Sequence, residues 1–86
     1  MTYTVYILFS ETTGGYYIGY SSNISKRITQ HNQGLTISTK GKGPWKIAYT
    51  ETFQNKRDAL KREQFLKKQK NRDFYKKLIA TNNSNN

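Results

Sequence analysis

The sequence predicts a small α+β domain in which a three-stranded antiparallel sheet is flanked by helices, in the order ββαβαα. Two runs of β-branched and aromatic residues near the start, separated by a loop that ends in Gly-Gly, indicate a hairpin. Two later stretches place apolar residues at helical spacing after polar residues that can cap a helix. The length of 86 residues supports one domain with one core, which we expect to span residues 1–80, before a disordered polar tail over 81–86.

Residue patterns place each element in turn. Runs rich in β-branched and aromatic residues predict strands at residues 3–9, 16–20 and 46–53. Apolar spacing and capping residues predict helices at about 23–33, 56–69 and 71–80. Residues 35–46, rich in Gly and Lys, indicate a mobile basic loop. In the third strand, alternation places Ile47, Tyr49 and Phe53 on one face.

The hairpin carries two tyrosines whose position follows from alternation. Side chains along a strand point to opposite faces, and the most apolar match puts Val5, Ile7 and Phe9 on the same face as Ile18. This pairing leaves Tyr6 and Tyr17 together on the other face, beside Gly19. Because Gly19 has no side chain, another group or a ligand can approach there. The tyrosines are therefore either core aromatics with solvated hydroxyl groups or part of a site.

The first predicted helix places a cation and an imidazole near its apolar stripe. Arg27 and His31 lie one turn apart, at the edge of the stripe formed by Ile24 and Ile28. A histidine in such a place is commonly structural, and an arginine commonly extends its charge to solvent. Both the structural and the functional interpretation stay open at this point.

The second predicted helix carries an inward-pointing acid. Glu63 lies four residues after Ala59 and three before Leu66, so it points into the apolar arc of the helix. A buried carboxylate needs a cation, a metal or several hydrogen bonds. One interpretation is an ion pair with a nearby base, namely Arg62, Lys67 or Arg27. The other is a hard divalent cation, Mg²⁺ or Mn²⁺, which needs only one or two carboxylates.

Charge and composition narrow the function classes. The chain has 15 Lys and Arg against 5 Asp and Glu, a net charge of +10, which favours a nucleic-acid partner. We expect the DNA phosphates to contact these basic residues: Lys26, Lys40, Lys42, Lys46, Lys61, Lys67, Lys68, Lys70 and Arg72. No cysteine and a single His exclude a disulfide framework, a Cys-ligated zinc site and thiol catalysis.

No targeting feature marks the sequence. There is no apolar run near the ~20 residues of a membrane span, and the first residues lack the basic and apolar regions of a signal peptide. We therefore expect a cytoplasmic protein without a membrane partner.

The order of the motifs resembles a known family. From about Tyr3 to Ile79, the chain resembles the GIY-YIG nuclease superfamily, in particular its small stand-alone members, and is similar to the nuclease domain of the bacterial excision-repair incision subunit. The residues that carry the resemblance are Val5-Tyr6-Ile7, Tyr17-Ile18-Gly19, Arg27, His31, and Arg62-Glu63 with Lys67. The first triad reads Thr4-Val5-Tyr6 where the family has Gly-Ile-Tyr, so it loses a glycine and keeps the tyrosine.

The resemblance implies a metal-dependent DNA endonuclease, in repair or recombination, that hydrolyses a phosphodiester bond. It implies that Glu63 holds Mg²⁺ or Mn²⁺ and that Tyr6 orients or deprotonates the attacking water. Tyr17 would bind the metal's water shell or the phosphate. Arg27 would stabilise charge on the phosphate, and His31 would assist. Some relatives have a further late asparagine, for which the sequence offers Asn71.

Two other function classes fit the same sequence. A non-catalytic nucleic-acid binder would use the basic surface with aromatic stacking residues: Tyr3, Tyr16, Tyr20 and Trp45. A protein-interaction module is disfavoured by the positive charge. The set of two tyrosines, Arg27, His31 and Glu63 favours the nuclease, because a binder has no need for an inward acid. The sequence predicts neither the preferred DNA structure nor any protein partner or oligomeric state.

Overall fold

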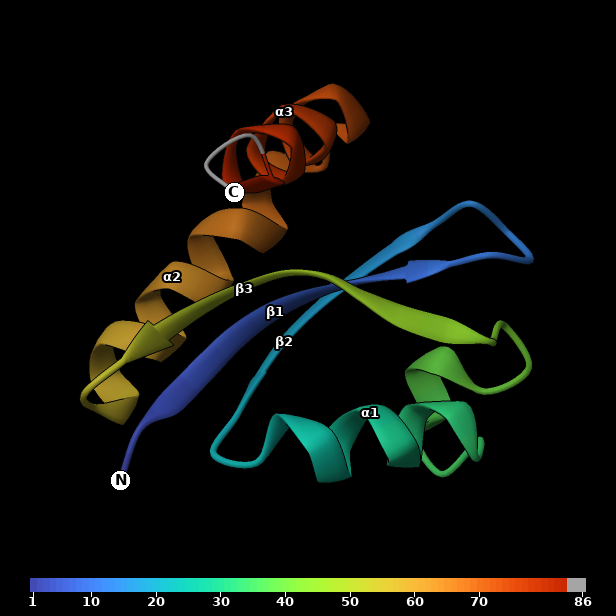
Figure 1. The fold of residues 1–86 in the computed structure, drawn as a ribbon, viewed down its shortest axis with the longest axis horizontal. Coiled ribbons are helices and arrows are strands. Elements are labelled where there is room, and N and C mark those ends of the chain that lie inside the picture. Colours follow the sequence, from blue (N-terminus) through green and yellow to red (C-terminus); the bar gives the residue numbers. More distant parts are fainter. Residues whose placement is uncertain (84–86) are drawn as a thin grey trace.

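The computed structural model describes residues 1–83 of the chain. Its elements follow one another in this order: β1 (Tyr3–Ser10), β2 (Tyr16–Ser21), α1 (Ile24–Asn32), a short 3₁₀ helix η1 (Ile37–Thr39), β3 (Trp45–Phe53), α2 (Lys56–Gln69) and α3 (Arg72–Asn83). The strands form one antiparallel sheet in the order β2-β1-β3 (Figure 1). The predicted fold class and element order are confirmed. Within residues 1–83, no helix is long and apolar enough to cross a membrane.

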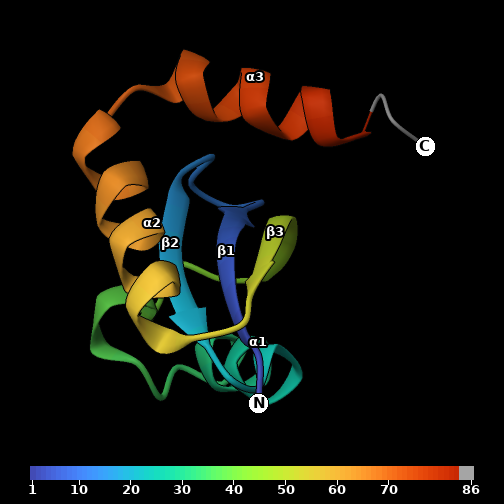
Figure 2. The same ribbon diagram turned by 90° about the vertical axis from the view of Figure 1, so that its left-hand side faces the viewer.

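The sheet separates two apolar clusters. Figure 2 shows α1 at one end of the sheet and α3 at the other, with α2 running along the side. The larger cluster lies under α2 and α3: Val5, Ile7, Ile18, Tyr49, Ala59, Leu66 and Tyr75. The smaller cluster consists of Tyr6, Leu8 and Trp45, with Tyr17, Ile24 and Ile28 packed against it. The central strand β1 is thus buried on both faces, which explains its continuous apolar and aromatic run.

The register of the hairpin confirms the alternation argument. Ile7 lies opposite Ile18, and Tyr6 lies opposite Gly19. The expectation for β3 is wrong at one residue. Tyr49 pairs with Ile7, but Ile47 pairs with Leu8, because the register shifts between these two pairs. The additional residue reverses the alternation, so Ile47 lies on the opposite face from Tyr49 and is 43% exposed.

The helix ends follow the capping residues of the sequence. The side chains of Asn23 and Asn55 accept backbone N–H groups of α1 and α2. Gly34 has φ +75° just after α1, the left-handed conformation that ends many helices. Asn71 caps α3 with its side-chain oxygen, 2.9 Å from the Asp73 nitrogen. This contact gives Asn71 a structural role at a helix start.

Helix α3 extends further than predicted. It runs to Asn83, so the expected boundary between domain and tail at residue 80 falls inside a helix. The remaining residues of the expected tail, 84–86, lie outside the described part of the chain.

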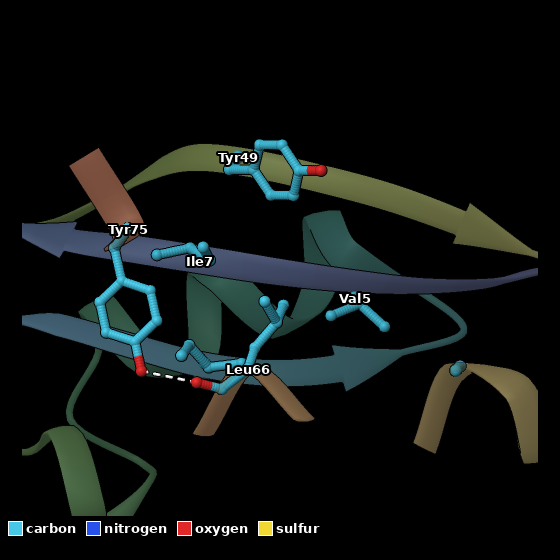
Figure 3. Packing of buried hydrophobic residues seen from close by; sticks show 7 residues of the cluster. Val5, Ile7, Tyr49, Leu66 and Tyr75 are labelled. Atoms are coloured by element: carbon cyan, nitrogen blue, oxygen red, sulfur yellow. Dashed lines mark hydrogen bonds between the residues drawn. The ribbon is translucent and has the colours of Figure 1, made fainter. Parts of the chain in front are cut away.

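A tyrosine joins α2 to α3. The Tyr75 hydroxyl donates a 2.6 Å hydrogen bond to the Leu66 carbonyl, drawn in Figure 3, and accepts one from the Lys70 nitrogen at 3.2 Å. Lys70 has φ 45°, a left-handed conformation that turns the chain between the two helices. Tyr75 is itself packed in the larger cluster, so this turn fixes α3 against the sheet.

The basic segment after α1 is held by hydrogen bonds. We expected a mobile loop, but η1 forms within it, and side chains of neighbouring elements hold its backbone. The Asn32 side chain pairs with the backbone of Trp45 in both directions, at 2.6 and 3.0 Å. On the hairpin side, Ser10 donates to the Lys42 carbonyl. These contacts place the loop beside the smaller cluster.

Candidate active site

A buried tyrosine–histidine pair forms the centre of the site. Strand β1 supplies Tyr6 and helix α1 supplies His31, and the Tyr6 hydroxyl lies 3.1 Å from His31 Nε2. Each of the two residues is only 1% exposed. A hydrogen bond shielded in this way has a fixed geometry and little competition from water.

Gly19 makes room for the tyrosine. A Cβ atom built at Gly19 would lie 2.5 Å from the Tyr6 hydroxyl oxygen and 2.7 Å from the ring carbon Cζ. The Tyr6 ring therefore passes directly over the Gly19 backbone. Both elements of this contact lie on the hairpin, so the glycine of β2 determines where the tyrosine hydroxyl is placed.

Tyr17 lies beside the pair. Its ring centroid is 5.1 Å from that of His31 and 6.3 Å from that of Trp45. Tyr17 is half-buried, whereas Tyr6 is enclosed, so Tyr17 forms the solvent-facing side of this aromatic group. It is therefore the tyrosine that an incoming ligand meets first.

Arg27 provides the cation of the site. Burial raises the pKa of Tyr6 above 10.0, and the Arg27 guanidinium opposes this through a hydrogen bond and its charge. Burial also lowers the pKa of His31 below 6.5, and the Arg27 charge lowers it further. Near neutral pH the pair is thus an uncharged phenol beside an uncharged imidazole. Arg27 Nη1 donates to Gln30 Oε1 at 3.2 Å, which orients the guanidinium.

Glu63 lies inward, as its spacing predicted. It is 8% exposed, and its charge contributes to raising the pKa of Tyr6. Of the three bases considered as partners, Lys67 makes the ion pair, with its Nζ 3.4 Å from Glu63 Oε2. Arg62 instead binds Glu51 at 2.9 Å, beside Tyr49. The ion pair with Lys67 is half-exposed on the lysine side and is easily exchanged for another cation.

The oxygen donors at Glu63 fit Mg²⁺ or Mn²⁺. Within residues 1–83, no three His, Cys, Asp or Glu side chains gather in a way that could hold a metal. A fully protein-ligated zinc or calcium site is therefore not formed by these residues. Mg²⁺ keeps several waters and is commonly bound by one or two carboxylates together with substrate phosphate oxygens. One inward carboxylate near enough to Tyr6 to raise its pKa matches that requirement.

The structure thus brings all five predicted site residues into one cluster. Tyr6 is linked to His31 by a hydrogen bond, and Arg27, Tyr17 and Glu63 each change its pKa by their proximity. They come from β1, β2, α1 and α2. Their individual roles remain predictions.

The basic residues predicted to contact DNA divide into two groups. Seven are exposed side chains, of which Lys67 also pairs with Glu63: Lys26, Lys40, Lys42, Lys61, Lys67, Lys68 and Lys70. The other two have contacts within the chain. Lys46 lies 3.8 Å from Glu11, and Arg72 donates to the Gly14 carbonyl at 2.7 Å.

Sequence patterns missed one residue of the cluster. Thr39 is 1% exposed, and its hydroxyl oxygen lies 2.8 Å from His31 Nδ1. It sits in a stretch of Thr, Ser, Gly and Lys that carries no strand or helix periodicity. Only the folding of the loop back onto α1 reveals the contact, so no sequence signal marks it.

The comparisons with known proteins agree with this geometry. The family model described as "GIY-YIG catalytic domain" matches residues 2–78, which is most of the chain. The chain belongs to the GIY-YIG catalytic domain family.

Similar proteins include small chains of one group. A UPF0213 protein of Clostridium perfringens is 47% identical over 53 residues, which cover 60% of this chain and 57% of that protein. The matched segment is thus less than two thirds of that relative's length. A UPF0213 protein of Limosilactobacillus reuteri is 32% identical over 80 residues, covering 90% of this chain and 82% of that protein. The solution NMR structure of a UPF0213 protein from Bacillus halodurans has a TM-score of 0.58 and 30% identity, and covers 94% of this chain and 85% of the other.

Membership of the GIY-YIG family gives the motif residues a common frame. The nuclease-type fold places the tyrosine of Val5-Tyr6-Ile7 and the glycine of Tyr17-Ile18-Gly19 on paired positions of the hairpin. The Tyr6-over-Gly19 contact explains physically why these two triads occur together. Thr4 stands where the family has glycine, and alternation along β1 puts it on the same strand face as Tyr6.

Proposed function

We propose that this protein is a metal-dependent endonuclease that hydrolyses a phosphodiester bond of DNA. The observation that carries the proposal is the convergence of a buried Tyr6–His31 hydrogen bond, the Arg27 cation and one inward acid, Glu63. GIY-YIG membership and the net charge of +10 support a nucleic-acid substrate.

Each side chain has a role that its surroundings allow. Arg27 is oriented by Gln30 and stabilises the negative charge that develops on the phosphate oxygens. Tyr6 accepts a proton from the attacking water as its own hydroxyl proton passes to His31. Tyr17, on the solvent-facing side, orients the phosphate by a hydrogen bond. Glu63 would hold the divalent cation in place of its ion pair with Lys67.

The cation would supply two things when bound: a bound water of lowered pKa and compensation for phosphate charge. The chain's own residues would then position the phosphate and deprotonate the attacking water. Exposed lysines around the site, including Lys26 on α1 and Lys40 in the following loop, would bind the flanking phosphates.

One observation favours the non-catalytic nucleic-acid binder instead. The ion pair with Lys67 satisfies Glu63 without any metal. A binder would keep that pair when DNA is bound. Trp45, however, is 6% exposed, so it is poorly placed as a stacking surface.

A cleavage and binding panel separates these functions. The protein is incubated with supercoiled, branched and flapped DNA, with Mg²⁺, Mn²⁺ or a chelator, and binding is measured on the same substrates. The nuclease proposal predicts cleavage of at least one substrate that the chelator abolishes. Binding of every substrate with no cleavage under any metal would instead establish the binder.

A further inference from the structure

A chain of hydrogen bonds extends from the candidate site into the loop after α1. Tyr6 lies 3.1 Å from His31 Nε2, and His31 Nδ1 lies 2.8 Å from the Thr39 hydroxyl oxygen. The Thr39 hydroxyl in turn donates to the Thr36 carbonyl at 3.4 Å. Tyr6, His31 and Thr39 are each 1% exposed, so protein groups alone determine where the hydrogens lie.

The direction of each bond follows from counting hydrogens. The Thr36 carbonyl can only accept, and at 3.4 Å it is the acceptor within reach of the Thr39 hydroxyl besides His31 Nδ1. When the hydroxyl hydrogen is used at Thr36, Thr39 accepts at its oxygen, which requires a hydrogen on His31 Nδ1; the opposite tautomer would have Thr39 donate to Nδ1. A neutral imidazole has one N–H, so Nε2 carries none and accepts from the Tyr6 hydroxyl. Burial and the Arg27 charge lower the pKa of His31, which keeps the ring neutral.

We propose that Thr39 is a positioning residue that holds His31 as the Nδ1–H tautomer, so that Nε2 takes the Tyr6 proton during phosphodiester hydrolysis. This inference rests on the proposed function. As the water O–H bond breaks, a new O–H bond forms on Tyr6, and the original Tyr6 hydrogen passes to Nε2. The hydroxide adds to phosphorus as the bond to the leaving oxygen breaks, and the leaving oxygen takes a proton from solvent. The imidazolium, still bonded to Thr39 through Nδ1–H, then returns its Nε2 proton to the Tyr6 oxygen, and the other hydroxyl hydrogen of Tyr6 passes to solvent.

Thr39 is itself held rigidly. Its carbonyl accepts a 3.2 Å hydrogen bond from Trp45 Nε1, and its nitrogen donates to the Thr36 carbonyl at 3.1 Å. The Asn32 side chain, on the helix that carries His31, pairs with the Trp45 backbone. The loop and α1 are therefore tied together at two places, and the threonine cannot turn away without breaking both.

The tautomer is measurable without any substrate. The chain has one His, so nitrogen NMR chemical shifts of uniformly labelled wild-type protein near neutral pH report only on His31. We expect a protonated Nδ1 and an unprotonated Nε2. A predominant Nε2–H tautomer would overturn the inference, because Tyr6 would then face a donor.

Two variants test the function of the contact. Thr39→Val keeps the shape and removes the hydroxyl, whereas Thr39→Ser keeps the hydroxyl. We expect Thr39→Val to lose the tautomer preference and to lower kcat by about tenfold or more at a nearly unchanged KM, since a general base contributes about 10²–10⁴-fold. Thr39→Ser should stay within a few-fold of wild type in both readouts.

The outcomes separate this inference from the proposed function. Wild-type kcat in a folded Thr39→Val protein, or a change confined to KM, would refute the positioning role while leaving the nuclease proposal intact. If Thr39→Val fails to fold, the tautomer of His31 in the wild type and the tautomer and kcat of Thr39→Ser still test the positioning role. An Nε2–H tautomer in the wild type would refute it. A wild-type protein that cleaves no DNA would overturn the proposed function and the catalytic part of this inference, and the NMR result would still decide the tautomer.

Discussion

Replacing Gly19 by alanine tests the placement of Tyr6, the tyrosine proposed to be catalytic. The added Cβ would meet the Tyr6 hydroxyl oxygen at 2.5 Å and Cζ at 2.7 Å. Both atoms belong to a rigid ring that is 1% exposed and packed with Leu8 and Trp45. The ring cannot move outward without disturbing the smaller cluster, and any movement lengthens its 3.1 Å contact with His31.

The expected loss of stability combines three effects. Overpacking of a core costs roughly 1–3 kcal/mol. A lost hydrogen bond costs about 0.5–1.5 kcal/mol. Alanine recovers about 0.5–1 kcal/mol relative to glycine in a strand. The net destabilisation of Gly19→Ala is therefore about 0.5–4 kcal/mol, which corresponds to a fall in Tm of roughly 2–30 °C for a domain of this size.

Urea unfolding of the wild type and two variants measures this effect. Gly15→Ala is the matched control, because its Cβ would meet only the flexible hydroxyl of Thr13, at 3.2 Å. We expect Gly15→Ala to differ from wild type by less than about 0.5 kcal/mol. If Gly19→Ala is as stable as wild type and keeps the Tyr6–His31 hydrogen bond, the argument from close approach is refuted.

Two further predictions concern charge. Burial, then the Glu51 hydrogen bond, raises the pKa of Tyr49 from 10.0 to about 12. The neutral form of Tyr49 stabilises the fold fully below pH 10, and this contribution is lost as pH rises toward 12. The free energy of unfolding of wild type should therefore fall by about 2–3 kcal/mol more than that of Tyr49→Phe over this range. The same change of unfolding free energy with pH in both proteins, measured by urea unfolding, would contradict this. For DNA binding, Lys40→Ala should lower the slope of log affinity against log salt by about 0.7–0.9, whereas Lys77→Ala on α3 should leave it unchanged. A wild-type affinity independent of salt would exclude nucleic acid as the partner.

Residues on regular elements could be placed from the sequence. Alternation in the hairpin put Tyr6 on the face away from Ile7, together with Tyr17 and beside Gly19, and helical spacing put Glu63 on the buried arc of α2. These predictions hold because the period of a strand or a helix is fixed by backbone geometry. The cluster follows from them once the helices are packed on the sheet.

Residues that depend on an irregularity or on loop closure could not be placed. Ile47 has the same parity as Tyr49 in the sequence, but the register shift next to Leu8 reverses its face. Thr39 reaches His31 only because the loop after α1 folds back, and no periodicity encodes that path. The Glu51–Arg62 ion pair joins β3 to α2, so its partners are known only from the packing of the two elements.

The proposed nuclease function depends most on the role of Glu63. Glu63→Gln keeps the side-chain shape and removes the charge needed to hold a divalent cation. Because its partner Lys67 is half-exposed, loss of the ion pair costs little stability, and the variant should fold. Lys67→Met is the matched control, since it breaks the same ion pair and keeps the acid.

The most direct measurement is the rate of DNA cleavage by wild type, Glu63→Gln and Lys67→Met with Mg²⁺, with DNA affinity measured in parallel. We predict that Glu63→Gln lowers the rate by orders of magnitude while its DNA affinity stays equal or increases, because a negative charge has left a phosphate-facing surface. Lys67→Met should retain cleavage, with its DNA affinity lowered by the loss of one phosphate contact. Near wild-type cleavage by a folded Glu63→Gln protein, or cleavage that a chelator does not reduce, would contradict the account.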